Sequence, residues 1–339
     1  MGLSVSVIIP TFNRASVIAR AVESVIVQLA DGDELIVVDD GSTDDTARAL
    51  ARFGPRVRLI SVENGGAGRA RNRGVSEARG DLVAFLDSDD EWMPGKLALT
   101  RRWLEARPDT LFVFSDFAAT DSDGMVHRRH LINWHGDPRT WNEILGPGAP
   151  FSSVASLPEG RSDFQVYVGS LYEREFERAY VLTSSLVTRR VAAGDALHFC
   201  EDVPTQEDLE CFGRLARRGA AAYFDTETVW QHGGAGDRLS GIEELHRLAA
   251  NLVVLDRVWG ADRSFLATHG DAYRRVLDRL HLKRAAIFLN TGRMSEARHE
   301  VAGMTDAPLR YRVLMSLPPL LISAVLMLRK WLSFDLPQF

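Results

Sequence analysis

The sequence predicts an α/β protein whose mostly parallel sheet is covered by helices on both faces. Over the first 115 residues, short apolar runs typical of buried strands alternate with segments of helical periodicity. We expect strands at residues 5–9, 35–38, 57–62, 82–86 and 111–114, and helices at 15–29, 43–53, 68–78 and 94–106. Polar clusters follow four of these strands, at the edge where open α/β sheets bind ligands.

The alternation is interrupted between residues 117 and 178, where prolines and tryptophans stand among short polar stretches. We interpret this segment as a long insertion rather than a linker, because its aromatic side chains need burial, and loops of this length are usually functional. Further strands are expected at 180–188, 221–224 and 228–231, and helices at 206–218, 241–260, 271–289 and 294–301. The chain therefore divides into a domain at 1–240 with the insertion 117–178, a helical region at 241–305 and a tail at 306–339.

Composition excludes several classes of protein. The 339 residues are 45% hydrophobic and 25% charged, which is ordinary for a folded chain and too apolar for a disordered one. A formal net charge of -6 argues against a protein that coats nucleic acid, so no nucleic-acid partner is expected. Cys200 and Cys211 cannot form a disulfide framework or, alone, a structural zinc site. Without a basic leader before the first apolar run, we expect a cytoplasmic protein.

The first chemical signal is Asp87-Ser88-Asp89, directly after the strand expected at 82–86. Carboxylates two positions apart face the same crevice where the chain turns at a strand end. Because Mg²⁺ and Mn²⁺ bind oxygen ligands and share them with diphosphates, the motif predicts a divalent metal bridging to a diphosphate leaving group. The alternative is a solvated acidic turn.

Two further clusters indicate nucleotide binding. In Asp39-Asp40-Gly41-Ser42 a carboxylate can accept a hydrogen bond from a ribose hydroxyl or a base N–H. The glycines of Asn64-Gly65-Gly66-Ala67-Gly68 allow close backbone approach to an anion at a helix N-terminus, which Arg69 and Arg71 can also contact. The alternatives are a turn with a helix cap, and a small-residue helix with solvated arginines.

Two single residues complete the set of candidates. Asp208 is a candidate general base at a helix N-terminus, although Thr205-Gln206-Glu207-Asp208 also fits a capping box with Thr205 as the cap. His232 lies between an expected strand and a pair of glycines, and is a candidate metal ligand or phosphate contact. Lone histidines are more often neither.

Taken together, the motifs resemble family 2 glycosyltransferases, which have the GT-A fold. The resemblance spans residues 4–240 and follows the order of the family's motifs in segments 6–14, 37–44, 64–74, 85–90, 183–187 and 206–209. It implies that a nucleotide-sugar donor is bound by Pro10, Thr11, Phe12, Asn13, Arg14, Asp39, Asp40, Asn64, Arg71, Asp87 and Ser88. It further implies that Asp89 binds the metal, with Asp87 and His232 as additional candidates, and that Asp208 is the base.

The resemblance implies an inverting, metal-dependent transfer from a nucleoside diphosphate sugar, with uracil as the base, to a glycan or lipid-linked acceptor of a cell-surface polysaccharide. The cofactor would be Mn²⁺ or Mg²⁺. We expect the helix N-terminus to depress the pKa of Asp208 and keep it ionised. A nucleotidyltransferase and an inactive nucleotide-sugar-binding module remain alternatives.

The C-terminal tail predicts association with a membrane surface. Residues 313–328 carry no charge and are flanked by basic residues, Arg310 and Arg312 before and Arg329 and Lys330 after. Even as one helix, 16 residues would extend about 24 Å, less than a hydrocarbon core of about 30 Å. Pro318-Pro319 also interrupts such a helix. We therefore expect peripheral attachment on the cytoplasmic face; the alternative is packing on the protein or on a second subunit.

Overall fold

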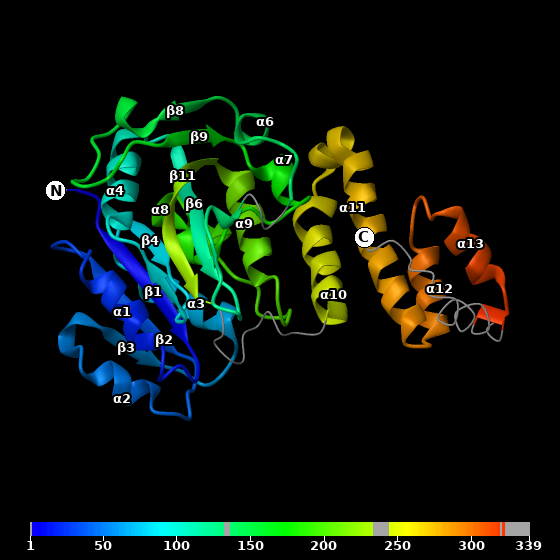
Figure 1. Ribbon diagram of the computed structural model, residues 1–339, viewed down its shortest axis with the longest axis horizontal. Coiled ribbons are helices and arrows are strands. Elements are labelled where there is room, and N and C mark those ends of the chain that lie inside the picture. Colours follow the sequence, from blue (N-terminus) through cyan, green and yellow to red (C-terminus); the bar gives the residue numbers. More distant parts are fainter. Residues whose placement is uncertain (1, 132–135, 233–243, 319–320, 323–339) are drawn as a thin grey trace. The chain divides into compact units, whose positions relative to one another are not determined.

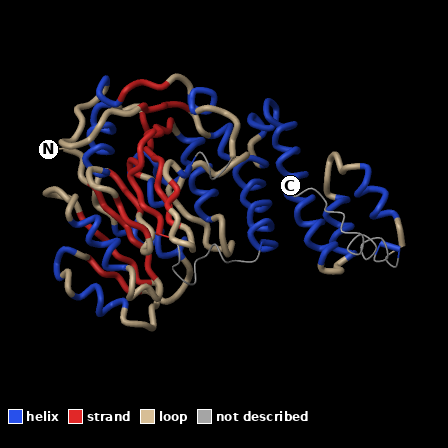
Figure 2. The backbone as a smooth tube through the Cα atoms, viewed as in Figure 1, coloured by secondary structure: helices blue, strands red, loops and turns tan. Residues whose placement is uncertain are grey.

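A computed structural model describes residues 2–131, 136–232, 244–318 and 321–322 of the chain. Its contacts divide into two compact units, Met1–Gly241 (unit 1) and Ile242–Phe339 (unit 2). Unit 1 is an α/β layer structure around one large sheet, and unit 2 is helical where it is described (Figure 1; Figure 2).

The first part of unit 1 alternates strands and helices as the hydrophobic pattern predicts. Its elements are β1 (Val5–Thr11), α1 (Ile18–Ile26), β2 (Glu34–Asp39), α2 (Thr46–Ala51), β3 (Arg58–Ser61), α3 (Ala67–Glu77), β4 (Leu82–Phe85), β5 (Asp90–Trp92) and α4 (Lys96–Ala106). β1 is buried along its whole length because it lies inside the sheet. Helix α3 packs closely on it, since a Cβ atom at Gly74 would overlap Ile8.

The second part of unit 1 adds the remaining strands of the sheet and contains the insertion, residues 117–178. Its strands are β6 (Thr110–Thr120), β7 (Val126–His127), β8 (Gly148–Pro150), β9 (Gln165–Gly169), β10 (Val187–Arg189) and β11 (Ala220–His232). Its helices are α6 (Trp141–Leu145), α7 (Tyr172–Glu175), α8 (Arg190–Ala193) and α9 (Glu207–Arg218). The insertion thus contributes short strands and helices to unit 1.

The sheet has eleven strands with a parallel core. Its order is β3-β2-β1-β4-β10-β6-β11-β9-β8, with β5 paired to β11 and β7 to β6. The pairs β3-β2, β2-β1, β1-β4 and β6-β11 are parallel. β10 is antiparallel to both of its neighbours, so β4 and β6 run in the same direction on either side of it. The parallel strands therefore end at one edge of the sheet, which confirms the expected fold class.

Several expected elements have other bounds in the structure, among them the following. The strand expected at 180–188 is a strand only from Val187, because a 3-10 turn, Thr183–Ser185, precedes it. The strands expected at 221–224 and 228–231 are one strand, β11, with register shifts inside it. The helix expected from residue 94 begins at Lys96, after Gly95 in a left-handed conformation (φ 84°).

Unit 2 is helical and has its own apolar core. Its helices are α10 (Glu244–Leu255), a π-helical turn (Asp256–Gly260), α11 (Arg263–Asn290), α12 (Met294–Ala302) and α13 (Leu309–Ser316). Tyr311 and Met315 of α13 are buried in one cluster with Ala297 and Val301 of α12. Among the described residues, no helix combines the length and apolar character needed to span a membrane.

Candidate active site

The loop after β1 is tied to the loop after β2 at the edge of the sheet where the crevice is expected. β1 and β2 end side by side, with Thr11 paired to Asp39. Asn13 takes a left-handed conformation (φ 51°), donates its N–H to Ser42 Oγ (2.9 Å) and accepts from Thr43 N at Oδ1 (2.8 Å). Asn13 therefore joins the two loops. Phe12, in the loop after β1, leaves 43% of its surface exposed, and its role in binding the donor stays a prediction.

Asp39, the last residue of β2, and Asp40, directly after it, are buried, and each accepts hydrogen bonds from backbone N–H groups. Asp39 accepts from Ser42 N (2.9 Å), which closes the turn. Asp40 accepts from the N–H groups of Gly65 and Gly66 (2.9 and 2.8 Å), and Asn64 donates its side-chain amide to the Asp40 carbonyl (2.9 Å). Burial raises the pKa of Asp40, against these two backbone hydrogen bonds. Asp40 therefore fixes the glycine-rich loop, and its carboxylate keeps further lone pairs for a ligand N–H.

Arg71 links the metal motif to the helix that carries the candidate base. The side chain is buried on α3, donating from Nη2 to Asp87 Oδ1 (2.9 Å) and from Nη1 to Glu207 Oε1 (2.7 Å). Its guanidinium also lies over the Phe199 ring, 5.2 Å from the centroid. Burial acts to lower the pKa of Arg71, but the charges of Asp87 and Glu207 outweigh it and hold that pKa above its usual value. Because both terminal nitrogens bind carboxylates, a contact from Arg71 to the donor phosphates stays a prediction.

Asp208 lies in the first turn of α9, next to Glu207, and is only partly exposed. The capping box considered from the sequence is wrong: the residue that precedes α9 is Gln206, in a left-handed conformation (φ 69°), without a side-chain cap. The Asp208 carboxylate instead accepts from Leu209 N (2.7 Å). The expected depressed pKa is also wrong. Desolvation by the surrounding protein and the charge of Glu207 raise the pKa of Asp208 to about 7, against the pull of Arg71.

A buried 3-10 turn, Thr183–Ser185 (the serine turn), holds the metal motif in place. Ser184 Oγ accepts from Asp87 N (3.0 Å) and donates to Asp90 Oδ2 (2.7 Å), and the Ser184 carbonyl accepts from Trp92 Nε1 (2.8 Å). Ser88 is buried within the motif, and Arg20 donates to the Asp89 carbonyl (3.0 Å). Sequence reasoning assigned no role to Ser184, although the resemblance covered its segment. Glu207, the partner of Arg71, was likewise given none.

The candidate metal ligand His232 lies next to Glu91 in the structure. It ends β11, stacks near Trp230, and shares a hydrogen bond with Glu91 Oε2 through Nε2 (3.1 Å). The glycines that follow it, which suggested a phosphate contact, lie outside the described residues. His232 as a metal ligand therefore stays a prediction.

Asp87 and Asp89 fit a metal that is shared with a substrate. Nowhere in the described part of the chain do three or more His, Cys, Asp or Glu side chains gather as a metal cage. Mg²⁺ usually keeps waters and binds one or two carboxylates together with substrate phosphates. Asp87 and Asp89, both partly exposed at a strand end, provide that smaller donor set.

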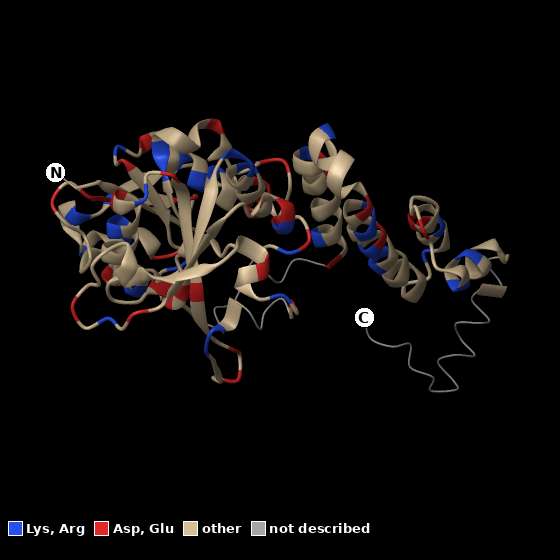
Figure 3. Ribbon diagram, turned by 90° about the horizontal axis from the view of Figure 1, so that it is seen from above, with Lys and Arg blue, Asp and Glu red and all other residues tan. Residues whose placement is uncertain are grey.

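In the view of Figure 3, basic and acidic residues are interspersed over both units.

Known proteins match this chain in sequence. Residues 6–157 match the family model of Glycosyl transferase family 2. The succinoglycan biosynthesis protein ExoO of Rhizobium meliloti is 44% identical over 230 residues, 65% of this chain and 60% of that protein. TuaG of Bacillus subtilis, named for teichuronic acid biosynthesis, is 38% identical over 151 residues, 42% of this chain and 59% of its own. This chain covers a smaller share of the length of other relatives. It therefore spans only part of the length of the curated proteins that it matches.

Solved structures show the same fold at low sequence identity. S. aureus TarS (residues 1–349) in complex with UDP-GlcNAc superposes with a TM-score of 0.59 at 16% identity, covering 92% of this chain and 83% of that one. The mannosyltransferase PcManGT from Pyrobaculum calidifontis, in complex with GDP-Man and Mn²⁺, gives a TM-score of 0.52 at 19% identity, covering 98% and 83%. The family match agrees with the motifs whose geometry is described above. Residues 6–157 of this chain form a glycosyltransferase family 2 domain within a GT-A fold.

Proposed function

We propose that the chain is a metal-dependent, inverting glycosyltransferase. It moves a sugar from a nucleoside diphosphate donor, with UDP as the nucleoside diphosphate, to a glycan or lipid-linked acceptor of a cell-surface polysaccharide. The observation that carries this proposal is the buried Arg71 bridge, which joins Asp87 of the metal motif to α9 beside Asp208. Because the bridge holds the two segments together, it supports a site in which the metal-bound leaving group and the base lie close to each other.

The comparisons support the substrates at the level of class. Two relatives are named for succinoglycan and teichuronic acid biosynthesis, which supports a polysaccharide product. TarS was solved with UDP-GlcNAc, which supports a UDP-sugar donor, and PcManGT with Mn²⁺, which supports a divalent metal.

In the proposed reaction Asp208 accepts the proton of the acceptor hydroxyl while its oxygen bonds to the anomeric carbon. The bond from that carbon to the diphosphate breaks on the opposite face, so the configuration inverts. A pKa near 7 suits a general base, because such a group is ionised at neutral pH and still accepts a proton readily. Arg71 holds the Asp87 carboxylate in place, and Phe12, Asp40 and Asn64 line the proposed nucleoside side of the crevice. Mn²⁺ or Mg²⁺ held by Asp87 and Asp89 would neutralise charge on the departing diphosphate.

The experiment identifies the small product. A panel of nucleotide sugars is incubated with the protein in Mn²⁺ or Mg²⁺, and the released nucleotide is separated by anion-exchange chromatography. Release of a nucleoside diphosphate that stops in EDTA and resumes when Mn²⁺ is restored supports the proposal. Release of pyrophosphate would indicate a nucleotidyltransferase, and release of neither, with donor still bound, a binding module; both results contradict it.

We also propose that the protein is peripheral on the cytoplasmic face of a membrane through residues 306–339. The described part of this tail supports it: on α13 the apolar side chains of Leu309 and Val313 are 67% and 54% exposed, beside Arg310 and Arg312. Exposed apolar groups flanked by arginines are typical of segments that bind the headgroup region. Tyr311 and Met315 point into the core of unit 2, so the exposed side chains do not serve that packing.

A further inference from the structure

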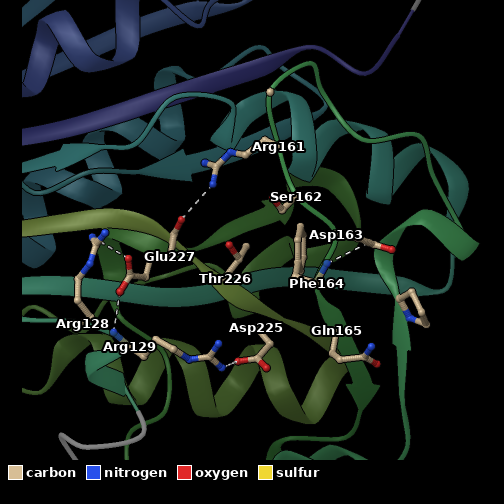
Figure 4. A pocket seen from close by; sticks show the side chains of 12 residues that line it. Arg128, Arg129, Arg161, Ser162, Asp163, Phe164, Gln165, Asp225, Thr226 and Glu227 are labelled. Atoms are coloured by element: carbon tan, nitrogen blue, oxygen red, sulfur yellow. Dashed lines mark hydrogen bonds and ion pairs between the residues drawn. The ribbon is translucent and has the colours of Figure 1, made fainter.

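A cavity lies in unit 1 away from the proposed donor and metal residues. Its volume is about 850 Å³, and it lies between the loop before β9, the residues after β7 and the middle of β11 (Figure 4). Ligand pockets commonly have volumes of about 300–1,000 Å³, so the cavity can hold a small ligand. None of the residues proposed to bind the donor or the metal lines it.

The strand that forms one wall is irregular at the cavity. Between Phe224 and Val229 the pairing of β11 with β6 shifts register twice, on either side of Glu227. Such bulges redirect side chains and are frequent next to binding sites. Here Asp225, Thr226 and Glu227 line the cavity, as Figure 4 shows.

The charged side chains that line the cavity balance one another. They are three arginines and three carboxylates: Arg128, Arg129, Arg161, Asp163, Asp225 and Glu227. Arg128 pairs with Glu227 (2.9 Å) and Arg129 pairs with Asp225. The lining therefore carries no net formal charge that would favour an acidic polymer.

The remaining lining suits a sugar. Phe164 is partly exposed and packs on Phe151 and Phe224, with ring centroids 5.1 and 5.5 Å away, which fixes its ring in the wall. A sugar presents C–H groups that pack on such a ring, and hydroxyls that both donate and accept hydrogen bonds. The neighbouring Gln165 and Thr226 offer donors and acceptors, as do the paired arginines and carboxylates.

Arg161 connects the cavity to the segment that carries the metal motif. Its guanidinium donates to the Pro94 carbonyl (3.0 Å from Nε) and to the Glu227 carbonyl (3.5 Å from Nη1). Pro94 follows β5, which begins directly after Asp89 and pairs with β11. One continuous stretch of chain, residues 87–95, therefore runs from the crevice to the cavity wall.

We propose that this cavity binds neutral sugar units of the acceptor, other than the unit that receives the transferred sugar. The assignment to the acceptor rests on the glycosyl transfer proposed above.

The test uses the full-length protein on an array of immobilised oligosaccharides. The probes are neutral di- to tetrasaccharides of gluco, galacto and manno configuration, with uronic-acid and phosphorylated counterparts. The wild type is expected to bind at least one neutral probe and to prefer it to its acidic counterparts. Phe164→Ala removes the ring, and Ser162→Trp fills the cavity from an exposed position; each should weaken that binding at least tenfold. Ser76→Trp, at an exposed serine on α3 outside the cavity, is the matched control and should bind as the wild type does.

Binding to no neutral probe, a preference for acidic probes, or binding that Ser162→Trp leaves unchanged would overturn the proposal. A thermal melt of each variant separates lost binding from lost folding; should Phe164→Ala unfold, Ser162→Trp decides. Nucleoside diphosphate release by the wild type is measured in parallel. Release without neutral-sugar binding rejects the cavity proposal alone. Cavity-dependent binding without release rejects the transferase proposal and leaves the sugar site standing.

Discussion

Arg71 is a buried cation whose two terminal nitrogens hold carboxylates from β4's end and from α9. Removing one member of a buried charge network leaves the others unpaired, which costs about 3–5 kcal/mol. We therefore expect Arg71→Met to lower the free energy of unfolding by about that amount. Urea denaturation measures it, with Arg69→Met as the control because Arg69 is exposed on the same helix. Equal stability of the two variants would show that the bridge does not hold these elements together.

Asp208 must be ionised to accept a proton, and its pKa is raised to about 7. The rate of transfer should therefore fall as the pH drops below about 7, by about tenfold per pH unit once the acid form dominates. Initial rates of nucleoside diphosphate release between pH 5 and pH 9, at saturating metal, give the profile. A rate that stays constant down to pH 5 would exclude Asp208, with this pKa, as the base.

The position of four carboxylates at strand ends could be predicted from the sequence, because an apolar run marks each strand. Asp39, Asp40, Asp87 and Asp89 each follow a recognisable apolar run, and parallel strands end together. The bridge from Arg71 to Glu207 joins residues 136 positions apart, and no local pattern reveals such a pair. The pKa of Asp208 was predicted in the wrong direction for the same reason: the helix terminus is local, whereas burial and the charges around it come from distant segments.

Among the secondary-structure elements, the positions of the strands were easier to predict from the sequence than the neighbours with which each strand pairs. Isolated apolar runs located β1, β2 and β4 within a few residues. The segment 180–188 looked like one strand, but Ser185 N bonds to the Leu182 carbonyl (2.8 Å) and Ser184 binds Asp90, which makes a turn there. Whether a serine pairs in a ladder or closes a turn depends on partners that the local sequence does not contain.

Helix α4 begins with Lys96, which is fully buried beneath the serine turn. Its Nζ donates to the Ser185 carbonyl (2.7 Å) and to Thr228 Oγ1 (3.2 Å). Burial, with the nearby charge of Arg161, lowers the pKa of Lys96 to about 7 from an ordinary value of 10.5. Between these values the unfolded chain binds the proton and the folded protein does not. Lys96 therefore makes stability rise with pH across this window.

The prediction is a difference between wild type and Lys96→Met. Each unit of pKa corresponds to about 1.4 kcal/mol, so the wild type should gain a few kcal/mol relative to the variant between pH 6.5 and pH 9.5. The variant is needed as a reference because Glu175, whose pKa is raised to about 8, makes the free energy of unfolding fall as the pH rises. Urea denaturation at the two pH values measures it. A constant difference would mean that Lys96 keeps its charge when folded.

For the whole molecule, the sequence of the tail predicts attachment to a membrane surface. A chain that ends at Ile322 keeps α13 and the buried Tyr311, Met315 and Ile322, but loses the apolar residues 325–328 with Arg329 and Lys330. Each basic residue near an anionic surface adds about 1 kcal/mol to binding. We expect the full chain to float with anionic liposomes and the shortened chain, which keeps only the exposed α13 part of that surface, to float much less, with an unchanged melting temperature. A full chain that stays off liposomes, or a shortened one that unfolds, contradicts peripheral attachment through this segment.

The proposed active site transfers a sugar with a metal at Asp87 and Asp89 and a base at Asp208. The most direct test of this proposal measures donor affinity by calorimetry and nucleoside diphosphate release for wild type, Asp89→Ala and Asp208→Asn in Mn²⁺. Loss of a general base typically slows a reaction by about 10²–10⁴-fold. Asp208→Asn should show that loss while binding the donor as the wild type does, and Asp89→Ala should lose metal-dependent donor binding. Near-normal turnover by Asp208→Asn, or undiminished turnover by the wild type in EDTA, would contradict the account.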